Sequence, residues 1–302
     1  MRGVVVALGN FDGVHLGHQA VLRRALEVAG AMDGRVVAAT FDPHPRAVLR
    51  PGGEPPLLTT LNLRREALIR YGADEMRVIP FDATLSRKSP QEFVHDVLIG
   101  TLEASAIVVG ENFRFGYKAS GDFEDLSRYM READGEAHAV SLEGSNGDEE
   151  INSSRIRELL QQGAVNEAAR LLGRPYVLRG EVVVGERRGR LLQFPTANVL
   201  SEPEILVPAR GVYAGFVELD GVRRAACTNI GVAPTFERGE SKVEAHVLDF
   251  DRDLYGRVVD VGFVEKVRDE RKFGGIEELR AQIGRDVEVT RRIMESWSEK
   301  EY

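Results

Sequence analysis

Residues 4–18, VVVALGNFDGVHLGH, join an apolar run to a glycine-bearing turn that carries two histidines. The run 4–8 is apolar throughout, which predicts a strand buried on both faces. A helix is predicted after the turn, so unpaired backbone amides and the positive end of the helix dipole can face an anion. Such a junction can hold phosphates, and its small glycines let a nucleotide approach the backbone closely. His15 and His18, three residues apart, are expected on one side of the first helical turn.

The structural alternative for this stretch is a plain turn followed by histidines on a helix surface. The H-x-G-H element after a first strand, however, resembles the adenylyl- and cytidylyltransferase superfamily. That resemblance implies nucleotidyl transfer, in which the α-phosphate of ATP is attacked and pyrophosphate leaves.

The composition is that of an ordinary globular protein with room for two domains. The chain has 302 residues, of which 43% are hydrophobic and 29% charged. A formal net charge of −8 without a long basic block disfavours a nucleic-acid partner. Apolar runs stay far below the roughly 20 residues of a membrane helix, and no secretory signal is evident. We therefore expect no membrane partner.

Cys227 is the only cysteine of the chain. A single cysteine can build neither a disulfide framework nor a zinc cluster within one chain, and it fits a reduced, cytoplasmic setting. We expect its side chain to be a small buried apolar group.

The first half alternates between strand and helix patterns, which predicts a doubly wound parallel sheet of the Rossmann-like kind. In such sheets ligands bind beyond the carboxyl ends of the strands, where the strand order reverses. The loops at 9–18 and 109–116, after the first and fourth strands, are therefore the candidate binding loops. Strands are predicted at 4–9, 35–41, 76–81, 106–110 and 137–142, and helices at 19–29, 61–71, 90–102 and 122–132.

The second half of the chain has a different pattern of predicted secondary structure. After helices predicted from Arg155 and at 165–172, Gly173 marks the best domain border, which divides the chain into 1–173 and 174–302. Short β-rich runs then alternate with turns, which predicts an antiparallel barrel or sandwich. These runs lie at 177–184, 211–218, 222–229, 242–250 and 257–264, and closing helices are predicted at 276–283 and 286–297.

Residues 185–198, GERRGRLLQFPTAN, form a basic, glycine-punctuated loop that could wrap a polyphosphate. The Thr196 hydroxyl and the Asn198 amide oxygen are hard ligands that suit Mg²⁺. A purely structural turn is the alternative for this stretch.

Strand alternation at 242–250 puts Val243, Ala245 and Val247 on one face and Glu244, His246 and Leu248 on the other. A carboxylate inside a strand, on the same side as His246, is a general-base candidate. A solvated strand face remains the alternative.

Over nearly its whole length the chain resembles the prokaryotic bifunctional riboflavin kinase/FAD synthetase family. The resemblance implies a nucleotidyltransferase domain followed by a Greek-key β-barrel with C-terminal helices. The matching segments are GNFDGVHLGHQ at 9–19, FDPHP at 41–45, VGENFRFGYKASGD at 109–122, INSSRIRELL at 151–160, FPTANV at 194–199, GVYAG at 211–215, TNIGVAPTF at 228–236, VEAHVLDFDRDLYG at 243–256 and VRDERKFGGIEELRAQI at 267–283.

By this resemblance the N-terminal module transfers AMP from ATP to FMN, which yields FAD and pyrophosphate. His15 and His18 would contact the ATP phosphates and stabilise developing charge. Further nucleotide contacts are implied for Asn10, Phe11, Asp12, Gly13 and Asn112. Phe113 is the candidate for stacking on the flavin, with core packing as the alternative for it or for Phe115.

The superfamily's second motif, I-S-S-T-x-x-R, corresponds to residues 151–157, INSSRIR. The match implies that Ser153 and Ser154 hold phosphate oxygens and that Arg157 neutralises the departing pyrophosphate. Asn152 and Ser154 depart from the motif but keep polar side chains.

The C-terminal module would transfer the γ-phosphoryl group of ATP to the 5′-hydroxyl of riboflavin. Glu244 would be the catalytic base, and Thr196 and Asn198 would hold Mg²⁺ and nucleotide phosphates. Gly185 and Gly189 would belong to a flap over the nucleotide. Arg268, Glu270 and Phe273 would line the flavin side.

The expected partners are thus ATP, riboflavin, FMN and FAD, bound by a monomer or weak homo-oligomer. Gln193 replaces the glycine usual before Phe-Pro-Thr, which leaves open a single-activity adenylyltransferase with an inactive barrel. A flavin-binding regulator without turnover is the remaining alternative.

Overall fold

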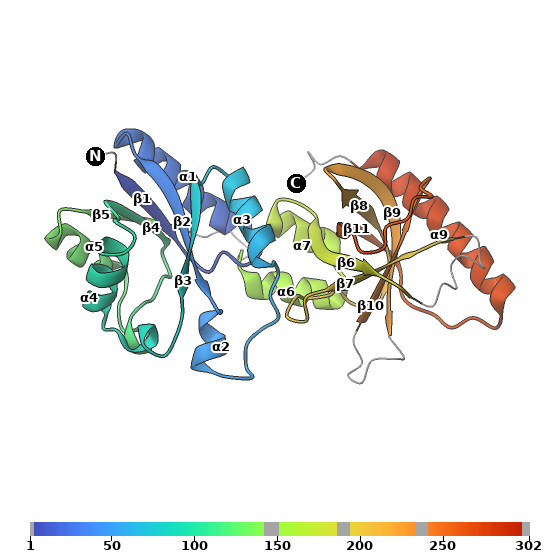
Figure 1. Ribbon diagram of the computed structural model, residues 1–302, viewed down its shortest axis with the longest axis horizontal. Helices are drawn as coiled ribbons and strands as arrows, with labels where there is room; N and C mark the ends of the chain where they lie inside the picture. The colour runs from blue at the N-terminus through green and yellow to red at the C-terminus, as the bar shows by residue number, and fades with distance from the viewer. Residues whose placement is uncertain (1–2, 142–150, 186–193, 233–240, 298–302) are drawn as a thin grey trace. The chain divides into compact units, whose positions relative to one another are not determined.

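The computed structural model describes residues 3–141, 151–185, 194–232 and 241–297. The chain divides into two compact units (Figure 1). The first comprises Met1–Pro56 and Leu61–Asn152, and the second comprises Leu57–Thr60 and Ser153–Tyr302.

The first unit is built on a five-stranded sheet with the order β3-β2-β1-β4-β5. Every neighbouring pair in it is parallel, which confirms the predicted doubly wound sheet. The order reverses between β1 and β4, so the ligand crevice of this topology is expected beyond the ends of these two strands. The strands are β1 (Val4–Leu8), β2 (Arg35–Asp42), β3 (Glu75–Pro80), β4 (Ala106–Gly110) and β5 (Glu136–Val140).

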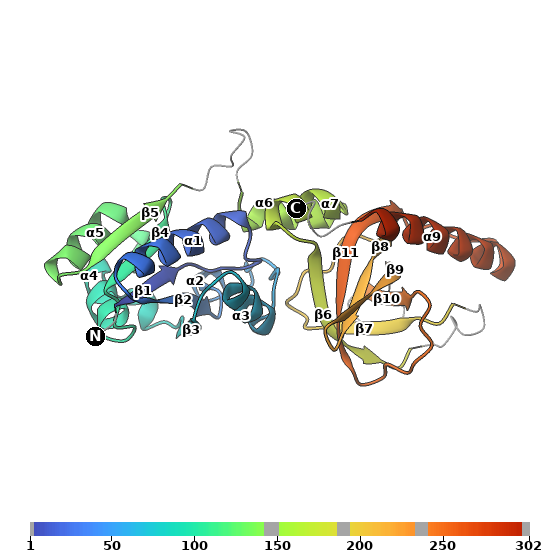
Figure 2. The same cartoon turned by 90° about the horizontal axis from the view of Figure 1, so that it is seen from above.

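Helices cover both faces of this sheet. All five residues of β1 are buried, and alternate side chains enter two separate cores. Val5 and Ala7 pack with α1 (Leu16–Ala31) and α3 (Leu61–Arg70), and Figure 2 shows α1 lying along this face. Val4, Val6 and Leu8 pack in the other core, with the helical segment η2 (Phe93–Ile99) and α5 (Phe123–Glu132).

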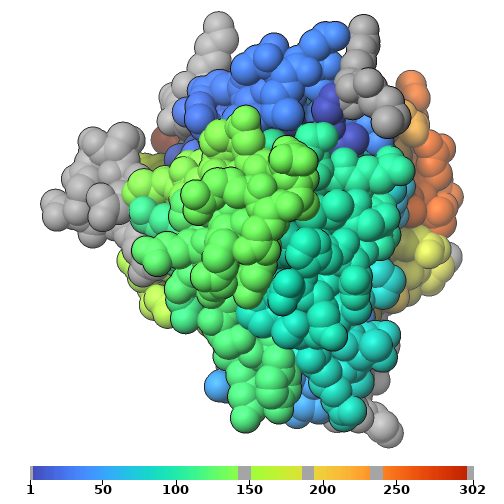
Figure 3. Space-filling view, turned by 90° about the vertical axis from the view of Figure 1, so that its left-hand side faces the viewer, coloured from blue at the N-terminus to red at the C-terminus, as the bar shows by residue number. Residues whose placement is uncertain are grey.

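The remaining helical segments of the first unit are short. The helix predicted at 90–102 begins as α4 (Pro90–Glu92), with a capping box between Ser89 and Glu92, and continues as the π-helical η2. Figure 3 shows one face of this unit, on which teal and green parts of the chain lie side by side, and η2 is in contact with α5. Not predicted were α2 (Pro45–Leu49), η1 (Leu85–Arg87) and η3 (Tyr117–Ala119), which are too short to show a helical period.

The second unit contains a closed antiparallel barrel with the order β10-β7-β6-β11-β8-β9. Strands β8, β9 and β10 follow one another through adjacent pairings, and β11 returns to lie beside β8, which confirms the Greek key. The elements are α6 (Ser153–Gln162), α7 (Val165–Leu172), β6 (Tyr176–Val183), β7 (Ala197–Ser201), β8 (Gly211–Leu219), β9 (Val222–Val232), β10 (Ser241–Val247), β11 (Val258–Arg268) and α9 (Ile276–Ser296).

Two sequence expectations for this unit are wrong. The two closing helices are one continuous helix, α9, because Gly284 within it is tolerated in a helix interior. The predicted loop 185–198 ends inside a strand that was not predicted, β7 (197–201), which pairs with β6 on one side and β10 on the other. A short segment that begins with Ala197 and Asn198 has little local preference for a strand, and pairing on both sides overrides it.

Gly173 ends α7 in the left-handed conformation at φ +69°, as a glycine after a helix commonly does. Both α6 and α7 belong to the compact unit that contains the barrel. In the parts of the chain that the structure describes, no helix combines the length and apolar character needed to cross a membrane.

Candidate active sites

The turn at 9–18 lies at the carboxyl end of β1, and the loop at 111–116 follows β4. Because β1 and β4 are direct neighbours in the sheet, both candidate loops leave the same edge at the point where the strand order reverses. The structure therefore places the two predicted loops where a doubly wound sheet binds its ligand.

The turn has an unusual backbone. Phe11, Gly13 and Val14 all have positive φ, at +49°, +84° and +44°. For a non-glycine residue this region costs on the order of 1–2 kcal/mol, and a β-branched residue such as Val14 seldom adopts it. The side chains of Phe11 and Val14 are fully buried in the core beside α1. Phe11 can thus offer a nucleotide its backbone but not its ring.

The two histidines lie together at the start of α1, as predicted. His15 is the N-cap of the helix, and its Nδ1 accepts a hydrogen bond from the His18 backbone N–H at 3.3 Å. The imidazole rings stack with centroids 3.6 Å apart. Since Nδ1 of His15 is the acceptor, a neutral ring carries its proton on Nε2, which can donate to a phosphate oxygen.

Gly17 lets other parts of the chain approach this helix start. A Cβ at this position would lie 3.2 Å from the His15 ring and 3.4 Å from the Ile151 carbonyl oxygen. The beginning of the predicted second motif therefore lies against the histidine turn. Ser153, Ser154 and Arg157 follow on α6, which is grouped with the second unit, and their role toward ATP stays a prediction.

Side chains of the 111–116 loop divide between surface and core. Asn112 is exposed, and Phe113 is half-buried. Phe113 stacks on the buried Phe115 with centroids 5.6 Å apart. Core packing thus accounts for Phe115, while Phe113 keeps an exposed part that a flavin could contact.

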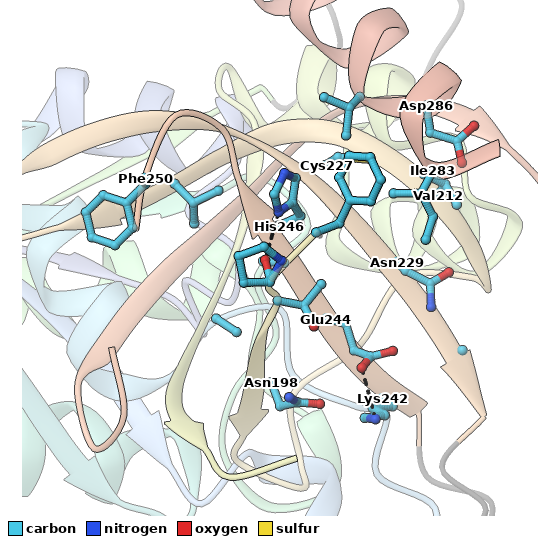
Figure 4. Close-up of a pocket in the computed structure, with 18 of the residues that line it drawn as sticks. Asn198, Val212, Cys227, Asn229, Lys242, Glu244, His246, Phe250, Ile283 and Asp286 are labelled. Atoms are coloured by element: carbon cyan, nitrogen blue, oxygen red, sulfur yellow. Dashed lines mark hydrogen bonds and ion pairs between the residues drawn. The ribbon is translucent and has the colours of Figure 1, made fainter. Parts of the chain in front are cut away.

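The second unit contains a cavity of about 750 Å³ against the barrel wall and α9 (Figure 4). This volume lies within the range usual for small-molecule sites. The cavity brings together predicted residues that are far apart in the sequence, namely Thr196, Asn198, Glu244, Arg268, Glu270 and Phe273.

Glu244 lies in the middle of a polar row that crosses three strands of the barrel. In the antiparallel register it stands opposite Asn198 on β7 and opposite Asn229 on β9. Such directly opposed residues bring their Cβ atoms to roughly 5 Å. Oε1 of Glu244 also lies 3.0 Å from Nζ of Lys242, and Figure 4 shows Asn198, Lys242 and Glu244 at one end of the cavity. Neither Asn229 nor Lys242 was predicted. The place of Asn229 beside Glu244 follows from strand register, whereas Lys242 shares a face of β10 with Glu244 by simple alternation.

Asn198 is 8% exposed, and its buried Oδ1 has no hydrogen-bond partner among the described residues. A buried amide oxygen without a partner is costly unless a ligand or ion completes it. Gly185 lies so close that a Cβ there would be 2.2 Å from Nδ2 of Asn198. The donor set of Thr196 and Asn198 fits a hard cation such as Mg²⁺. Gly189 lies outside the described residues.

His246 holds the segment that precedes Asn198. Its Nδ1 lies 2.7 Å from the carbonyl oxygen of Pro195, and its ring meets Phe194 edge-on with centroids 5.5 Å apart. A carbonyl oxygen only accepts, so the proton of a neutral His246 is on Nδ1. Glu244 and His246 lie on the same side of β10, as predicted, and both line the cavity.

Arg268 forms an ion pair with Asp286, which Figure 4 shows at the end of the cavity away from Lys242. Its Nε and Nη2 donate to the carboxylate of Asp286 on α9 at 3.0 and 2.7 Å. The Asp286 side chain is 4% exposed and also accepts from Gln282 at 2.7 Å. The Phe273 ring lies beneath the Arg268 and Arg271 guanidinium groups, at 5.7 and 4.8 Å. Asp286 was not predicted as a site residue, because its contact with Arg268 depends on how α9 packs on the barrel.

Cys227 is buried, as predicted, and its side chain contributes to the cavity wall. Burial raises the pKa of its thiol to about 11, so the group is neutral at physiological pH.

Comparison with known proteins finds a family match in each half of the chain. A family model described as FAD synthetase matches residues 1–155, and one described as riboflavin kinase matches residues 172–294. A bifunctional riboflavin kinase/FMN adenylyltransferase of Listeria monocytogenes is 37% identical over 95% of this chain and 91% of its own. The corresponding Bacillus subtilis protein is 37% identical over 93% of this chain and 90% of its own.

A solved structure from Streptococcus pneumoniae, whose title calls it a macrolide-efflux protein, has a TM-score of 0.87 and 35% identity. It covers 98% of this chain and 95% of its own, so it shares the fold of both halves. Its title differs from the descriptions of the two matching family models. The matches over both halves show that the chain belongs to the bifunctional riboflavin kinase/FMN adenylyltransferase family, with the FAD synthetase module first and the riboflavin kinase module second.

Proposed function

We propose that the barrel transfers the γ-phosphoryl group of ATP to the 5′-hydroxyl of riboflavin, and that the parallel-sheet unit adenylylates the resulting FMN. The observation that carries the kinase assignment is the row formed by Asn198, Glu244 and Asn229 along a cavity wide enough for a small molecule. The domain border at Gly173 and the cytoplasmic setting remain part of this proposal.

In the kinase site Glu244 accepts the proton of the 5′-hydroxyl. The hydroxyl oxygen of riboflavin bonds to the γ-phosphorus of ATP while the bond between that phosphorus and the leaving ADP breaks. A positioned carboxylate typically contributes 10²–10⁴-fold to such a proton transfer. Lys242, 3.0 Å from Glu244, orients the carboxylate at the cavity wall. Phe273, Glu270 and Arg268 also line the cavity, and the flavin is proposed to lie against them.

Thr196 and Asn198 are the residues that would hold Mg²⁺. When bound, the ion would neutralise charge on the phosphate oxygens of ATP. Oδ1 of Asn198, which has no hydrogen-bond partner within the described part of the chain, supports this assignment.

In the adenylyltransferase site a phosphate oxygen of FMN bonds to the α-phosphorus of ATP, and pyrophosphate leaves. This reaction needs positioning and charge stabilisation more than covalent help. The His15 Nε2 and the amides at the start of α1 are proposed to donate to phosphate oxygens, which the position of His15 as N-cap supports. Asn112 and Phe113 are proposed to contact nucleotide and flavin, and Ser153, Ser154 and Arg157 to hold the departing pyrophosphate.

The test is a product assay on the full-length protein. Riboflavin and MgATP are supplied, and FMN, FAD, ADP and pyrophosphate are separated by chromatography and followed with time. Glu244→Gln is expected to slow FMN formation by about 10²-fold or more, yet to leave FAD formation from supplied FMN unchanged. His18→Ala is expected to do the reverse.

Matched controls are Glu181→Gln, at an exposed position on β6, and His138→Ala on β5, and both should keep both activities. Equal loss of both activities in either test variant would contradict the assignment of sites to units. FAD formed from FMN without FMN formed from riboflavin would instead show an inactive barrel. Flavin binding without ATP consumption would show a regulator.

A further inference from the structure

Two buried side chains from other elements hydrogen-bond to the turn at residues 10–15, whose amides are proposed to bind the ATP phosphates. Thr40 on β2 is fully buried, and its Oγ1 donates to the Asn10 carbonyl oxygen at 2.8 Å. The same Oγ1 accepts from Nη1 of Arg64, on α3, at 3.2 Å. Nη2 of Arg64 reaches Oδ1 of Asp12 at 3.5 Å, and the two side chains are 4% and 1% exposed. One guanidinium therefore connects to the turn at two points, through Thr40 and through Asp12.

These contacts matter because the turn adopts a backbone that most residues avoid. Phe11 and Val14 have positive φ without being glycine. Within the turn, the Val14 N–H donates to the Phe11 carbonyl at 3.1 Å, and the Gln19 amide donates to the Val14 carbonyl at 3.0 Å. A strained conformation persists only where its surroundings over-determine it. The carbonyl of Asn10 and the carboxylate of Asp12 are fixed by Thr40 and Arg64, from outside the turn.

Stability alone does not require an arginine at this place. A buried ion pair is costly to desolvate, and apolar residues of similar volume often stabilise a core equally well or better. An apolar pair, however, could not hold the polar groups of the turn. The charged pair is thus better explained by what it positions than by the stability that it adds.

We propose that Thr40 and Arg64 are positioning residues for adenylyl transfer, which keep residues 10–15 in the conformation that presents the turn amides and His15 to the ATP phosphates. This rests on the proposed function, in which that turn holds ATP. Both residues lie beneath the surface, so they act through the turn.

The experiment compares Thr40→Val, which removes the hydroxyl at nearly constant volume, with Thr40→Ser, which keeps it. In full-length Thr40→Val, kcat for FAD formation from FMN is expected to fall about tenfold, while KM for FMN stays within twofold of wild type. Thr40→Ser should restore kcat to within threefold of wild type. Riboflavin phosphorylation, measured on the same preparations, should be unchanged because it takes place in the other unit.

Ser105→Ala is the matched control. Its hydroxyl accepts from the Val4 backbone N–H at 3.4 Å, at the opposite end of β1 from the turn. Loss of this hydroxyl should leave both activities at the wild-type level. Arg64→Met is expected to lower kcat for FAD formation further than Thr40→Val. If the Arg64 variant fails to fold, the comparison of Thr40→Val with Thr40→Ser still tests the positioning role.

FAD formation by Thr40→Val within twofold of wild type would overturn the inference. So would a Thr40→Ser variant as slow as Thr40→Val, because the hydroxyl would then not be the group that matters. A wild-type chain that formed FMN but no FAD from supplied FMN would overturn the proposed adenylyltransferase function itself, and with it this inference. The wild-type measurement thus separates the two failures.

Discussion

His246 on β10 donates its Nδ1–H to the Pro195 carbonyl oxygen across 2.7 Å. These residues are 51 positions apart, and the bond joins the strand that carries Glu244 to the segment that carries Thr196 and Asn198. The proposed base and the proposed nucleotide ligands are therefore held by the register of β7 on β10 and by this side-chain bond beside it.

His246→Phe should weaken ATP binding in the kinase reaction. Phenylalanine keeps an aromatic ring against Phe194 but lacks the donor that holds Pro195. Loss of one hydrogen bond of about 1 kcal/mol predicts a rise of roughly fivefold in KM for ATP. Steady-state measurement of FMN formation checks this, and His246→Gln, which can still donate, should lie between the variant and wild type. An unchanged KM in His246→Phe would show that Pro195 is held by other contacts.

Asn198→Ala should raise the Mg²⁺ concentration that FMN formation needs and leave that of FAD formation unchanged. Removal of Oδ1, for which the described residues offer no hydrogen-bond partner, takes away a proposed metal ligand, so half-maximal FMN formation should need about tenfold more Mg²⁺. Mg²⁺ titrations of both activities test this, since FAD formation should keep its wild-type dependence. Asn166→Ala, at an exposed position on α7, is the control. A parallel shift in both titrations would contradict the assignment of Asn198 to the kinase metal.

Asp286→Ala should destabilise the barrel unit by about 2–3 kcal/mol, because it leaves the partly buried Arg268 without its carboxylate. Urea unfolding followed by circular dichroism measures this change. The double variant Arg268→Met/Asp286→Leu should recover much of the lost stability, since neither charge is then left unpaired.

The exposed pair Arg257–Asp220 provides the comparison for this prediction, with side chains 51% and 71% exposed. Asp220 has positive φ at +51°, a region that asparagine tolerates better than alanine, so Asp220→Asn removes the charge without adding backbone strain. It should cost less than about 1 kcal/mol, since surface ion pairs contribute little. Equal losses from Asp286→Ala and Asp220→Asn would show that burial of the Asp286 carboxylate has no energetic consequence.

The free energy of unfolding should fall at alkaline pH because of Cys227. Burial raises the pKa of its thiol from 9.0 to about 11 in the folded chain. Below pH 9 the thiol is protonated in both states, so its contribution is fully present. Between pH 9 and about 11 only the unfolded chain ionises, and about 2–3 kcal/mol of stability is lost.

The measurement for Cys227 is the pH dependence of urea unfolding in wild type and in Cys227→Ala. Other groups titrate in the same range, so the difference between the two curves isolates the thiol. The stability difference in favour of wild type should shrink by this amount from pH 9 to 11. A constant difference would mean that the folded thiol ionises as readily as the unfolded one.

Local patterns predicted most elements because they depend on residues close together in the chain. The apolar run 4–8 is a strand buried on both faces, and alternation along β10 does separate Val243 and Ala245 from Glu244 and His246. Local reasoning failed at β7, where pairing on two sides decides the conformation. It failed again at α9, which continues through a glycine that ended the predicted helix.

The sequence by itself determined the family, the parallel sheet, the antiparallel barrel and the residue types that do the chemistry, because motifs and hydrophobic periods are written along the chain. Only the tertiary structure decided which side chains meet. It put Asn229 beside Glu244, Asp286 on Arg268, and Thr40 and Arg64 against the Asn10–Val14 turn. Those pairings depend on strand register, barrel closure and helix packing, which join residues far apart in the chain and leave no periodic trace in the sequence.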